Sequence, residues 1–340
     1  MFEVRGFRAM PPTNRALHRQ AILMLLLANV FWGVSFPVVK AMTLLHGQLL
    51  AGAGAWYTIS LTVAPRFLLA AVVLLLWQGR RVLSLTRGEL TQGGIIGLFS
   101  ATGMLLQTDG LRFTPASTSA FLTQFYAILI PIYVAVRSRR NPGARVWLSS
   151  ALVLVGVAIL GRFSWQNLGF GRGEWETLAS SLFFMGQILW LEKHEYAANR
   201  PGMITLVVCA TIALIFGTVM LATTPDVAAL VTTWTSAPWL GFTLILTVFC
   251  TLGAFSIMNA WQPKITATEA GLIYSVEPIF GSLMALYLPA VFSVWAAINY
   301  ANESATWNLL VGGGFITFAN VLIQLRPSPQ LEQAEARANL

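Results

Sequence analysis

The chain has 340 residues, of which 56% are hydrophobic and only 10% are charged, and its formal net charge is +8. Soluble domains carry about 25% charged residues, so the composition argues against a water-soluble enzyme or binding module and predicts an integral membrane protein. The histidines and cysteines show no metal-ligand spacing, and no nucleotide-binding or catalytic motif is present. We therefore expect no metal, no cofactor and no catalytic residues.

Ten apolar runs follow one another along the chain, separated by short polar stretches. Each has about the length that a helix needs to cross a hydrocarbon layer of roughly 30 Å. The predicted fold class is thus an all-α polytopic membrane protein with ten transmembrane helices. In chain order the runs are approximately 21–43, 57–78, 93–111, 117–136, 146–162, 174–191, 203–222, 237–260, 268–288 and 305–325.

Two of these runs need comment. The first follows four arginines, as a secretory signal does, but it is too long and lacks a small-x-small cleavage site at its end. We therefore predict a retained membrane helix, which Pro37 is expected to bend. The ninth run is followed by the apolar stretch 289–300, which either extends that span or lies in the membrane interface.

The basic residues orient the predicted helices. If the N-terminus is cytoplasmic, 16 of the 21 Lys and Arg residues fall in inside segments, as the positive-inside bias requires. We predict that both termini lie in the cytoplasm and that the protein resides in the cell inner membrane, with the lipid bilayer as its surroundings. Because topology explains the basic loops, no nucleic-acid partner is expected.

A weak internal repeat appears when the chain is shifted by 152 residues. Arg112-Phe113-Thr114 then lies on Lys264-Ile265-Thr266, and at nearly the same offset the sixth run lies on the first. Each unit holds five spans, an odd number, so the second copy must cross the membrane in the opposite sense. Inverted repeats of this kind are typical of secondary transporters. The predicted organisation is a cytoplasmic tail at 1–20, repeats at 21–165 and 174–325, and a cytoplasmic tail at 326–340.

Several stretches resemble the EamA-type transporters of the drug/metabolite transporter superfamily. NVFWGVSFPVVK at 29–40 resembles their first helix, with W-G-x-x-F and a lysine, and PRFLLAAVVLLL at 65–76 is similar to their R-F-L-L-A-A stretch. Three later stretches, at 108–134, 267–288 and 302–323, resemble the third-to-fourth helix passage, the E-P-x-x helix and the final helix. The resemblance implies ten helices in two EamA repeats, and export or exchange of small metabolites such as amino acids.

The sequence departs from the family pattern in one place. Between Lys40 and Arg66 it carries extra residues, GQLLAGAGAWYTI, where the family has a shorter turn. An external loop, a lid and a re-entrant segment are alternative expectations for this segment, and each leaves the placement of Arg66 open.

Glu277 is the leading candidate for a transport residue. An ionised side chain at mid-bilayer costs about 2.5 to 3.5 kcal/mol on insertion scales, so it needs a partner, water or a function. Glu277 falls near the middle of the ninth run, directly before Pro278, and a proline there frees a carbonyl one turn earlier. We hypothesise that Glu277 binds a substrate amine or carries a coupling proton. The alternative is a carboxyl group that is hydrogen-bonded within the bundle.

Other polar and aromatic residues could line a central cavity with Glu277, or could simply hold helices together by hydrogen bonds. The 152-residue offset places Gln124 and Tyr126 on either side of the position opposite Glu277, where they would make the two repeats asymmetric. Trp32, Phe36 and Phe184 could form an apolar wall. The remaining candidates for the cavity are Gln107, Gln187, Asn259 and Tyr274.

Four charged residues are expected near the outer surface. For Arg66, Asp109 and Arg112, a role in ion pairs or a gate competes with simple exposure to water, and we favour exposure. Lys40 is expected to extend its side chain to the outer interface, or otherwise to gate the outer mouth.

The sequence therefore predicts a secondary transporter that exports or exchanges small organic metabolites, most of all amino acids, by alternating access around a central cavity. A membrane-embedded enzyme and a passive channel are the alternative classes. Because no nucleotide site is present, transport is expected to draw on gradients, with protons as the candidate coupling ion.

Overall fold

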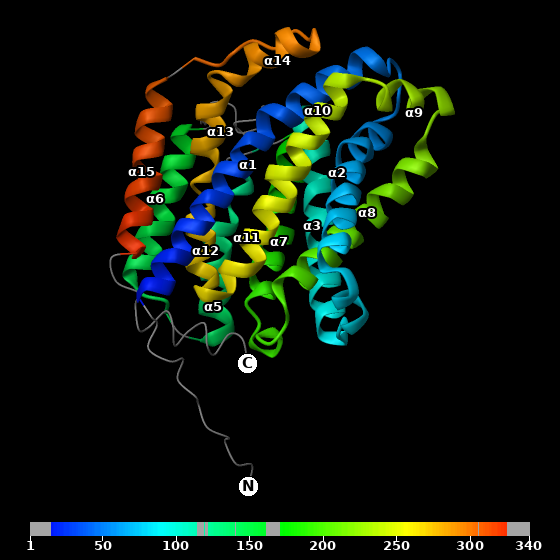
Figure 1. The fold of residues 1–340 in the computed structure, drawn as a ribbon. Coiled ribbons are helices and arrows are strands. Elements are labelled where there is room, and N and C mark those ends of the chain that lie inside the picture. Colours follow the sequence, from blue (N-terminus) through cyan, green and yellow to red (C-terminus); the bar gives the residue numbers. More distant parts are fainter. Residues whose placement is uncertain are drawn as a thin grey trace.

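The computed structural model describes residues 15–113, 119, 122–139, 141–160, 171–304 and 306–324, and throughout these residues the regular elements are helices. They form one upright bundle (Figure 1). In the first half the helices are α1 (Arg15–Leu49), α2 (Ala55–Gln78), η1 (Gly79–Ser84), α3 (Arg87–Phe113), α5 (Tyr126–Ser138) and α6 (Ala144–Leu160). In the second half they are α7 (Arg172–Leu191), η3 (His194–Tyr196), α8 (Pro201–Thr223), α9 (Val227–Trp234), α10 (Ala237–Ile245), η4 (Leu246–Gly253), α11 (Ala254–Trp261), η5 (Gln262–Lys264), α12 (Ala267–Tyr274), α13 (Glu277–Ala285), α14 (Leu288–Ala296) and α15 (Trp307–Gln324).

Four helical stretches in the described part of the chain are long and apolar enough to cross a membrane: Ala16–Leu49, Ala55–Ser84, Pro201–Thr223 and Ala237–Lys264. The pair Ala267–Ala285 and Leu288–Ala296 passes the same test together. An all-helical, multi-pass membrane protein is therefore confirmed. The remaining predicted runs coincide with helices that are shorter or less apolar, so the ten-span inverted repeat stays a prediction.

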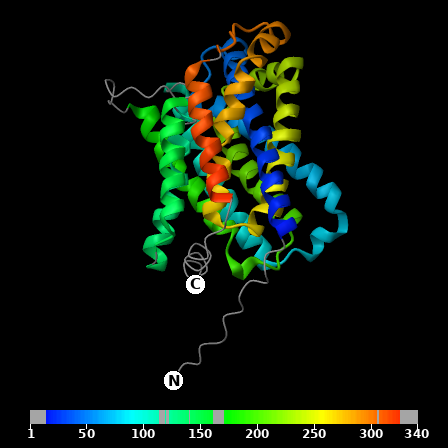
Figure 2. The same ribbon diagram turned by 90° about the vertical axis from the view of Figure 1, so that its left-hand side faces the viewer.

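The two ends of the bundle differ in charge. One end of the bundle holds the start of α1, the end of α15, η1 and η3 (Figures 1 and 2). The other end holds α9 and α14. Segment η1 carries Arg80 and Arg81, and the chain next to η3 carries Lys193 and Arg200. We call this the basic end, and the other the α14 end. The arrangement agrees with the predicted sidedness of the basic residues.

The extra residues between Lys40 and Arg66 do not form a long loop. Helix α1 continues to Leu49 and α2 begins at Ala55, so the extra residues mainly lengthen two helices. The connection turns tightly, with a hydrogen bond from the Ala53 N–H to the Leu50 carbonyl (3.0 Å) and Gly52 at φ 84°, a conformation that favours glycine. The expectation of an external loop, lid or re-entrant segment is corrected.

The ninth run is broken rather than continuous. Helix α12 ends at Tyr274 and α13 begins at Glu277, just before Pro278. The stretch after the run forms a separate helix, α14, and the bend between the pair α12–α13 and α14 is 56°. The stretch 289–300 therefore does not continue the ninth run as one straight helix, and α14 lies across the end of the bundle (Figure 1).

Small residues, Gly93 and Gly97, let α3 pack closely against α8. A Cβ atom at Gly97 would lie 2.7 Å from the Thr211 Cβ atom of α8, and one at Gly93 would lie 2.7 Å from the Val207 Cβ atom. Such contacts have no room for a side chain. Helix α3, which carries part of the cavity lining, is therefore held at a short separation from α8.

An ion pair between a buried carboxylate and a half-exposed arginine joins α3 to the start of α8 at the basic end. The Glu89 side chain is 1% exposed, and its two carboxylate oxygens accept hydrogen bonds from Arg200 Nε (2.6 Å) and an Arg200 terminal nitrogen (2.8 Å). The backbone N–H groups of Thr86 and Arg200 donate to the same carboxylate. Glu89 precedes the predicted span 93–111, and the hydrogen bond from Arg200 lowers its pKa from 4.5 to about 2.

The Glu89–Arg200 ion pair predicts how the stability of the folded protein depends on pH. Because the folded-state pKa lies below the ordinary value, its stabilisation is complete above about pH 4.5 and is lost as the pH falls toward 2. We expect Glu89→Gln to lower the Tm of the detergent-solubilised protein at neutral pH, and the difference from wild type to shrink in acid. Glu303→Gln, at an exposed position, is the control. A difference that does not change across this pH range would contradict the prediction.

Candidate functional site

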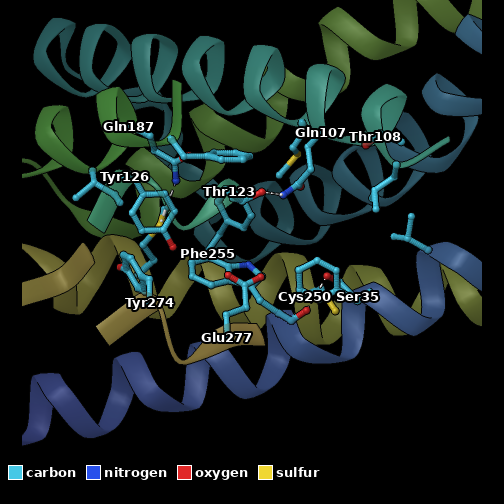
Figure 3. Close-up of a pocket in the computed structure, with 18 of the residues that line it drawn as sticks. Ser35, Gln107, Thr108, Thr123, Tyr126, Gln187, Cys250, Phe255, Tyr274 and Glu277 are labelled. Carbon is cyan, nitrogen blue, oxygen red and sulfur yellow. Dashed lines mark hydrogen bonds between the residues drawn. The ribbon is translucent and has the colours of Figure 1, made fainter. Parts of the chain in front are cut away.

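A cavity of about 140 Å³ lies inside the bundle. On the same measure one water needs roughly 10–15 Å³, so the cavity can hold a small organic molecule or on the order of ten waters. Figure 3 shows its polar and aromatic side chains converging on one space. They come from both halves of the chain: α1, α2, α3, the segment that leads into α5, the start of α5, α7, η4, α11, α12 and α13.

The cavity brings together nine of the residues that the sequence singles out. These are Trp32, Phe36, Arg66, Gln107, Tyr126, Phe184, Gln187, Tyr274 and Glu277. Five others do not line it: Lys40, Asp109, Arg112, Gln124 and Asn259. The cavity therefore gathers the aromatic residues and Glu277, as expected, and it adds Arg66, which we placed elsewhere.

Glu277 lies at the break between α12 and α13. The break places its carboxyl group in the first turn of α13, where the free backbone N–H groups and the helix dipole favour a negative charge. The carboxyl group faces the same space as Tyr126 and Tyr274 (Figure 3). Among the described residues no side chain donates a hydrogen bond or forms an ion pair with it. The alternative hypothesis was that this carboxyl group is hydrogen-bonded within the bundle. The contacts of the described residues include no such hydrogen bond from a side chain.

A buried hydrogen-bond chain joins two residues of the cavity lining, Tyr274 and Ile188, through Gln262 of η5. The Tyr274 hydroxyl donates to the Gln262 Oε1 atom (2.9 Å), and the Gln262 Nε2 atom donates to the Ile188 carbonyl (2.8 Å). Gln187 accepts from the Ser100 hydroxyl (2.8 Å) beside this chain. Elsewhere the lining reaches Leu111, close to the end of α3 at Phe113.

Aromatic rings form much of the wall. Trp32 contacts the rings of Tyr274 and Phe255 edge to face, at centroid separations of 5.4 and 6.0 Å. Phe36 lies next to Gly281 of α13, where an added Cβ atom would be 3.1 Å from the ring. On the polar side, the Gln107 Nε2 atom donates to the Thr123 hydroxyl (3.0 Å) (Figure 3). The cavity thus combines an apolar wall with a few fixed polar groups, which is usual for small-molecule sites.

Arg66 is not at the outer surface as we expected. It is 8% exposed and lines the cavity from α2. A terminal nitrogen of its guanidinium group lies 3.7 Å from the Met104 sulfur atom, and the group stacks near Phe67 at 5.0 Å from the ring centroid. The expectation of simple exposure was wrong because the lengthened α1 and α2 carry the chain past Arg66 to a turn several helical turns away.

Gln124 and Asn259 are buried outside the cavity. The Asn259 Nδ2 atom donates to the Thr205 hydroxyl (3.0 Å), which joins α11 to α8. Gln124 is 1% exposed and lies in the turn that leads into α5. For Asn259 the helix-joining alternative is therefore the one that the contacts favour, and neither residue is placed to touch a bound solute.

Asp109 and Arg112 form ion pairs rather than standing free in water. Asp109 accepts from Arg112 (3.1 Å) and from Arg172 at the start of α7, and Arg172 also pairs with Glu176 (2.6 Å). These ion pairs join the end of α3 to the start of α7. Arg112 is exposed, as we favoured, but it also takes part in an ion pair, which was the competing role. Lys40 is exposed, as its predicted position at the interface requires.

Several lining residues escaped the sequence analysis, although a signal for them existed. On α1 the lining is Trp32, Ser35, Phe36 and Val39, and on α3 it is Met104, Gln107, Thr108 and Leu111. Both sets follow the spacing i, i+3, i+4, i+7, which marks one face of a helix. Extending each predicted residue along its own helix face would have identified them. Cys250, Phe255 and Met258 carry no comparable signal, because η4 changes the helical repeat directly before α11.

Comparisons with known proteins agree with this description. Residues 19–162 match the EamA-like transporter family. A protein of Archaeoglobus fulgidus described as an uncharacterized transporter is 26% identical over 271 residues, which cover 78% of this chain and 77% of that protein. A solved crystal structure shares the fold with a TM-score of 0.65 over 90% of this chain and 97% of that chain, at 16% identity. The resemblance noted in the sequence is confirmed, and the comparisons point to a transporter rather than an enzyme.

Proposed function

We propose that this chain, a membrane transporter of the EamA type, is a secondary transporter that exports or exchanges small organic metabolites, amino acids among them. The observation that carries the proposal is the cavity inside the bundle, where Glu277 lies at a helix break among aromatic residues of both halves. Broken helices around a central site are the usual substrate-binding arrangement in such carriers.

The packing of the helices supports an inverted repeat of two five-span units. If the units are related by the 152-residue offset, α2 corresponds to α8 and α6 to α15, and the helices of each of these pairs pack against each other. Likewise α3 packs against α7, and the counterpart pair, α11 and α1, is also in contact. Rocking of one unit against the other would give alternating access to the cavity.

The hydrogen-bond chain at the basic end supports an assignment of the transport state. We take the basic end as cytoplasmic, from the positive-inside bias, and place the protein in the inner membrane. Tyr274, Gln262 and Ile188 then close the cytoplasmic side, while the lining reaches toward the outer end of α3. The structure is accordingly interpreted as a state that faces outward, and Glu277 is the candidate carrier of a coupling proton.

The proposal is tested by solute flux into proteoliposomes. A panel of labelled amino acids, nucleosides and organic cations is presented outside, with the same unlabelled solute inside. A carrier gives saturable uptake that the internal solute accelerates, because each turnover returns the empty site. Protein-free liposomes are the control. Conductance that does not saturate would instead indicate a channel, and the absence of saturable uptake for every solute would contradict the proposed function.

A further inference from the structure

Segment η1 lies at the basic end, where the chain passes from α2 to α3. It forms the last part of the helical stretch Ala55–Ser84, which is long and apolar enough to cross a membrane. In Figure 2 the cyan segment that joins α2 to α3 stands out from the side of the bundle at this end. The chain therefore reaches the boundary of the hydrocarbon layer at about η1.

One face of η1 is fixed to the rest of the bundle. Val82 and Leu85 are three residues apart, so they lie on one side of a 3₁₀ turn, and both pack against the buried core. Arg200, directly before α8, donates hydrogen bonds to the Ser84 hydroxyl (3.0 Å) and to the Ser84 carbonyl (2.8 Å). These contacts hold the opposite face of η1 toward the surroundings of the protein.

The outward face combines arginines with large apolar side chains. Arg80 and Arg81 are exposed, as is Arg87 at the start of α3. Beside them Trp77 is 84% exposed and Leu83 is 89% exposed. Tryptophan is enriched at membrane interfaces, and long basic side chains there extend toward the headgroups. Because exposure of Trp77 and Leu83 to water is unfavourable, this half of the face requires a hydrocarbon neighbour.

The three arginines have no counter-charge within the described part of the chain. The ion pairs of the described residues include neither Arg80 nor Arg81 nor Arg87. The acidic residue that follows them in the sequence is Glu89, and its carboxylate already pairs with Arg200. The face therefore presents positive charges whose negative partner must come from another molecule.

We propose that this face binds an anionic phospholipid of the leaflet at the basic end. Basic residues beside a membrane attract anionic headgroups, and a guanidinium group can donate two parallel hydrogen bonds to a phosphate. Arg80 and Arg81 hold the phosphate, Arg87 adds positive charge, and the acyl chains cover Trp77 and Leu83. A zwitterionic lipid carries its own ammonium group and compensates the arginines less. This site lies outside the cavity and is independent of the transported solute.

The test measures lipid binding to the purified full-length protein in an uncharged detergent by native mass spectrometry, which counts each bound lipid by its mass. Dioleoyl phosphatidylglycerol and dioleoyl phosphatidylcholine have the same acyl chains and differ in headgroup charge. We expect the anionic lipid to bind roughly tenfold more tightly or better, and its advantage to fall as the ammonium acetate concentration rises. Equal binding of the two lipids would overturn the inference.

Variants separate the charged part of the site from the apolar part. The double variant Arg80→Gln with Arg81→Gln should weaken binding of phosphatidylglycerol roughly tenfold or more and leave phosphatidylcholine unchanged. The double variant with Lys at both positions keeps the charge without the planar fork, so it should fall between this variant and wild type. Leu83→Ser should weaken binding of both lipids, because it removes apolar surface and no charge.

Each part has a matched control. Arg137→Gln with Arg145→Gln removes two exposed arginines of α5 and α6, and Val294→Ser changes a side chain that is 88% exposed on α14. Both should bind phosphatidylglycerol as wild type does. Equal losses in the two Arg→Gln double variants would overturn the inference, because net charge alone would then explain the binding.

Two further outcomes would assign the face to another partner. Inorganic phosphate at the concentration of the lipid should not displace phosphatidylglycerol, because it has no acyl chains; displacement would show a site for free phosphate. A wild-type dimer that Leu83→Ser converts to a monomer, with lipid binding unchanged, would show that a second copy of this chain covers the face. Either result would overturn the inference.

Discussion

Glu277→Gln is expected to lower transport efficiency by roughly 30-fold or more and to remove its dependence on a proton gradient. The amide has nearly the shape of the carboxyl group but neither holds a negative charge nor exchanges a proton. If the carboxylate binds an amine of the solute, loss of that buried charged contact costs about 2–5 kcal/mol, which corresponds to that factor. The measurement is counterflow in proteoliposomes at several values of internal and external pH.

The matched control for this variant is Glu303→Gln, which changes the same side chain at an exposed position between α14 and α15. It should retain wild-type rates and wild-type pH dependence. If the Glu277→Gln variant transported normally with an unchanged pH dependence, the proposal that Glu277 acts in transport would be wrong.

Gly33→Ala is expected to destabilise the protein and to impair transport together. A Cβ atom at Gly33 would lie 2.6 Å from the Phe280 Cβ atom and 3.0 Å from the Gly281 backbone nitrogen. Backbone cannot move aside as a flexible side chain does, so α1 and α13 must separate, and overpacking of this kind costs about 1–3 kcal/mol. These two helices carry Trp32, Phe36 and Glu277, and their separation would distort the cavity.

The measurement for Gly33→Ala is the Tm of the detergent-solubilised protein together with counterflow. Gly314→Ala in α15 is the control, because no atom lies within 4 Å of the added Cβ atom and alanine is favoured over glycine in a helix. We expect the control to keep or slightly raise the Tm. An unchanged Tm and unchanged transport in Gly33→Ala would contradict the close packing of α1 on α13.

The sequence was informative where one physical rule dominates. Apolar runs locate the helices, because every buried backbone group must be satisfied within its own segment. Glu277 could be identified because a carboxyl group beside a proline is expensive in the middle of a span. Trp32, Phe36 and Phe184, which we suggested as an apolar wall, all line the cavity that Glu277 lines.

The sequence was less informative where the answer depends on how helices rotate and end. Arg66 was misplaced because the extra residues before it resemble a loop, whereas they extend α1 and α2. Asn259 and Gln187 are both polar residues within apolar runs, yet Asn259 turns toward Thr205 while Gln187 reaches the cavity. Only the direction of each helix face in the bundle separates them.

The central claim is that the cavity is the place where the solute binds and from which it crosses the membrane. Ser35 lines the cavity from α1 (Figure 3), and Ser35→Cys changes one atom. In a background with Cys209→Ala and Cys250→Ala, a small membrane-impermeant thiol reagent added outside should modify this cysteine and block counterflow. A saturating concentration of the transported solute should slow the modification at least tenfold. Modification that proceeds at the same rate with and without solute, or that leaves counterflow intact, would contradict the claim.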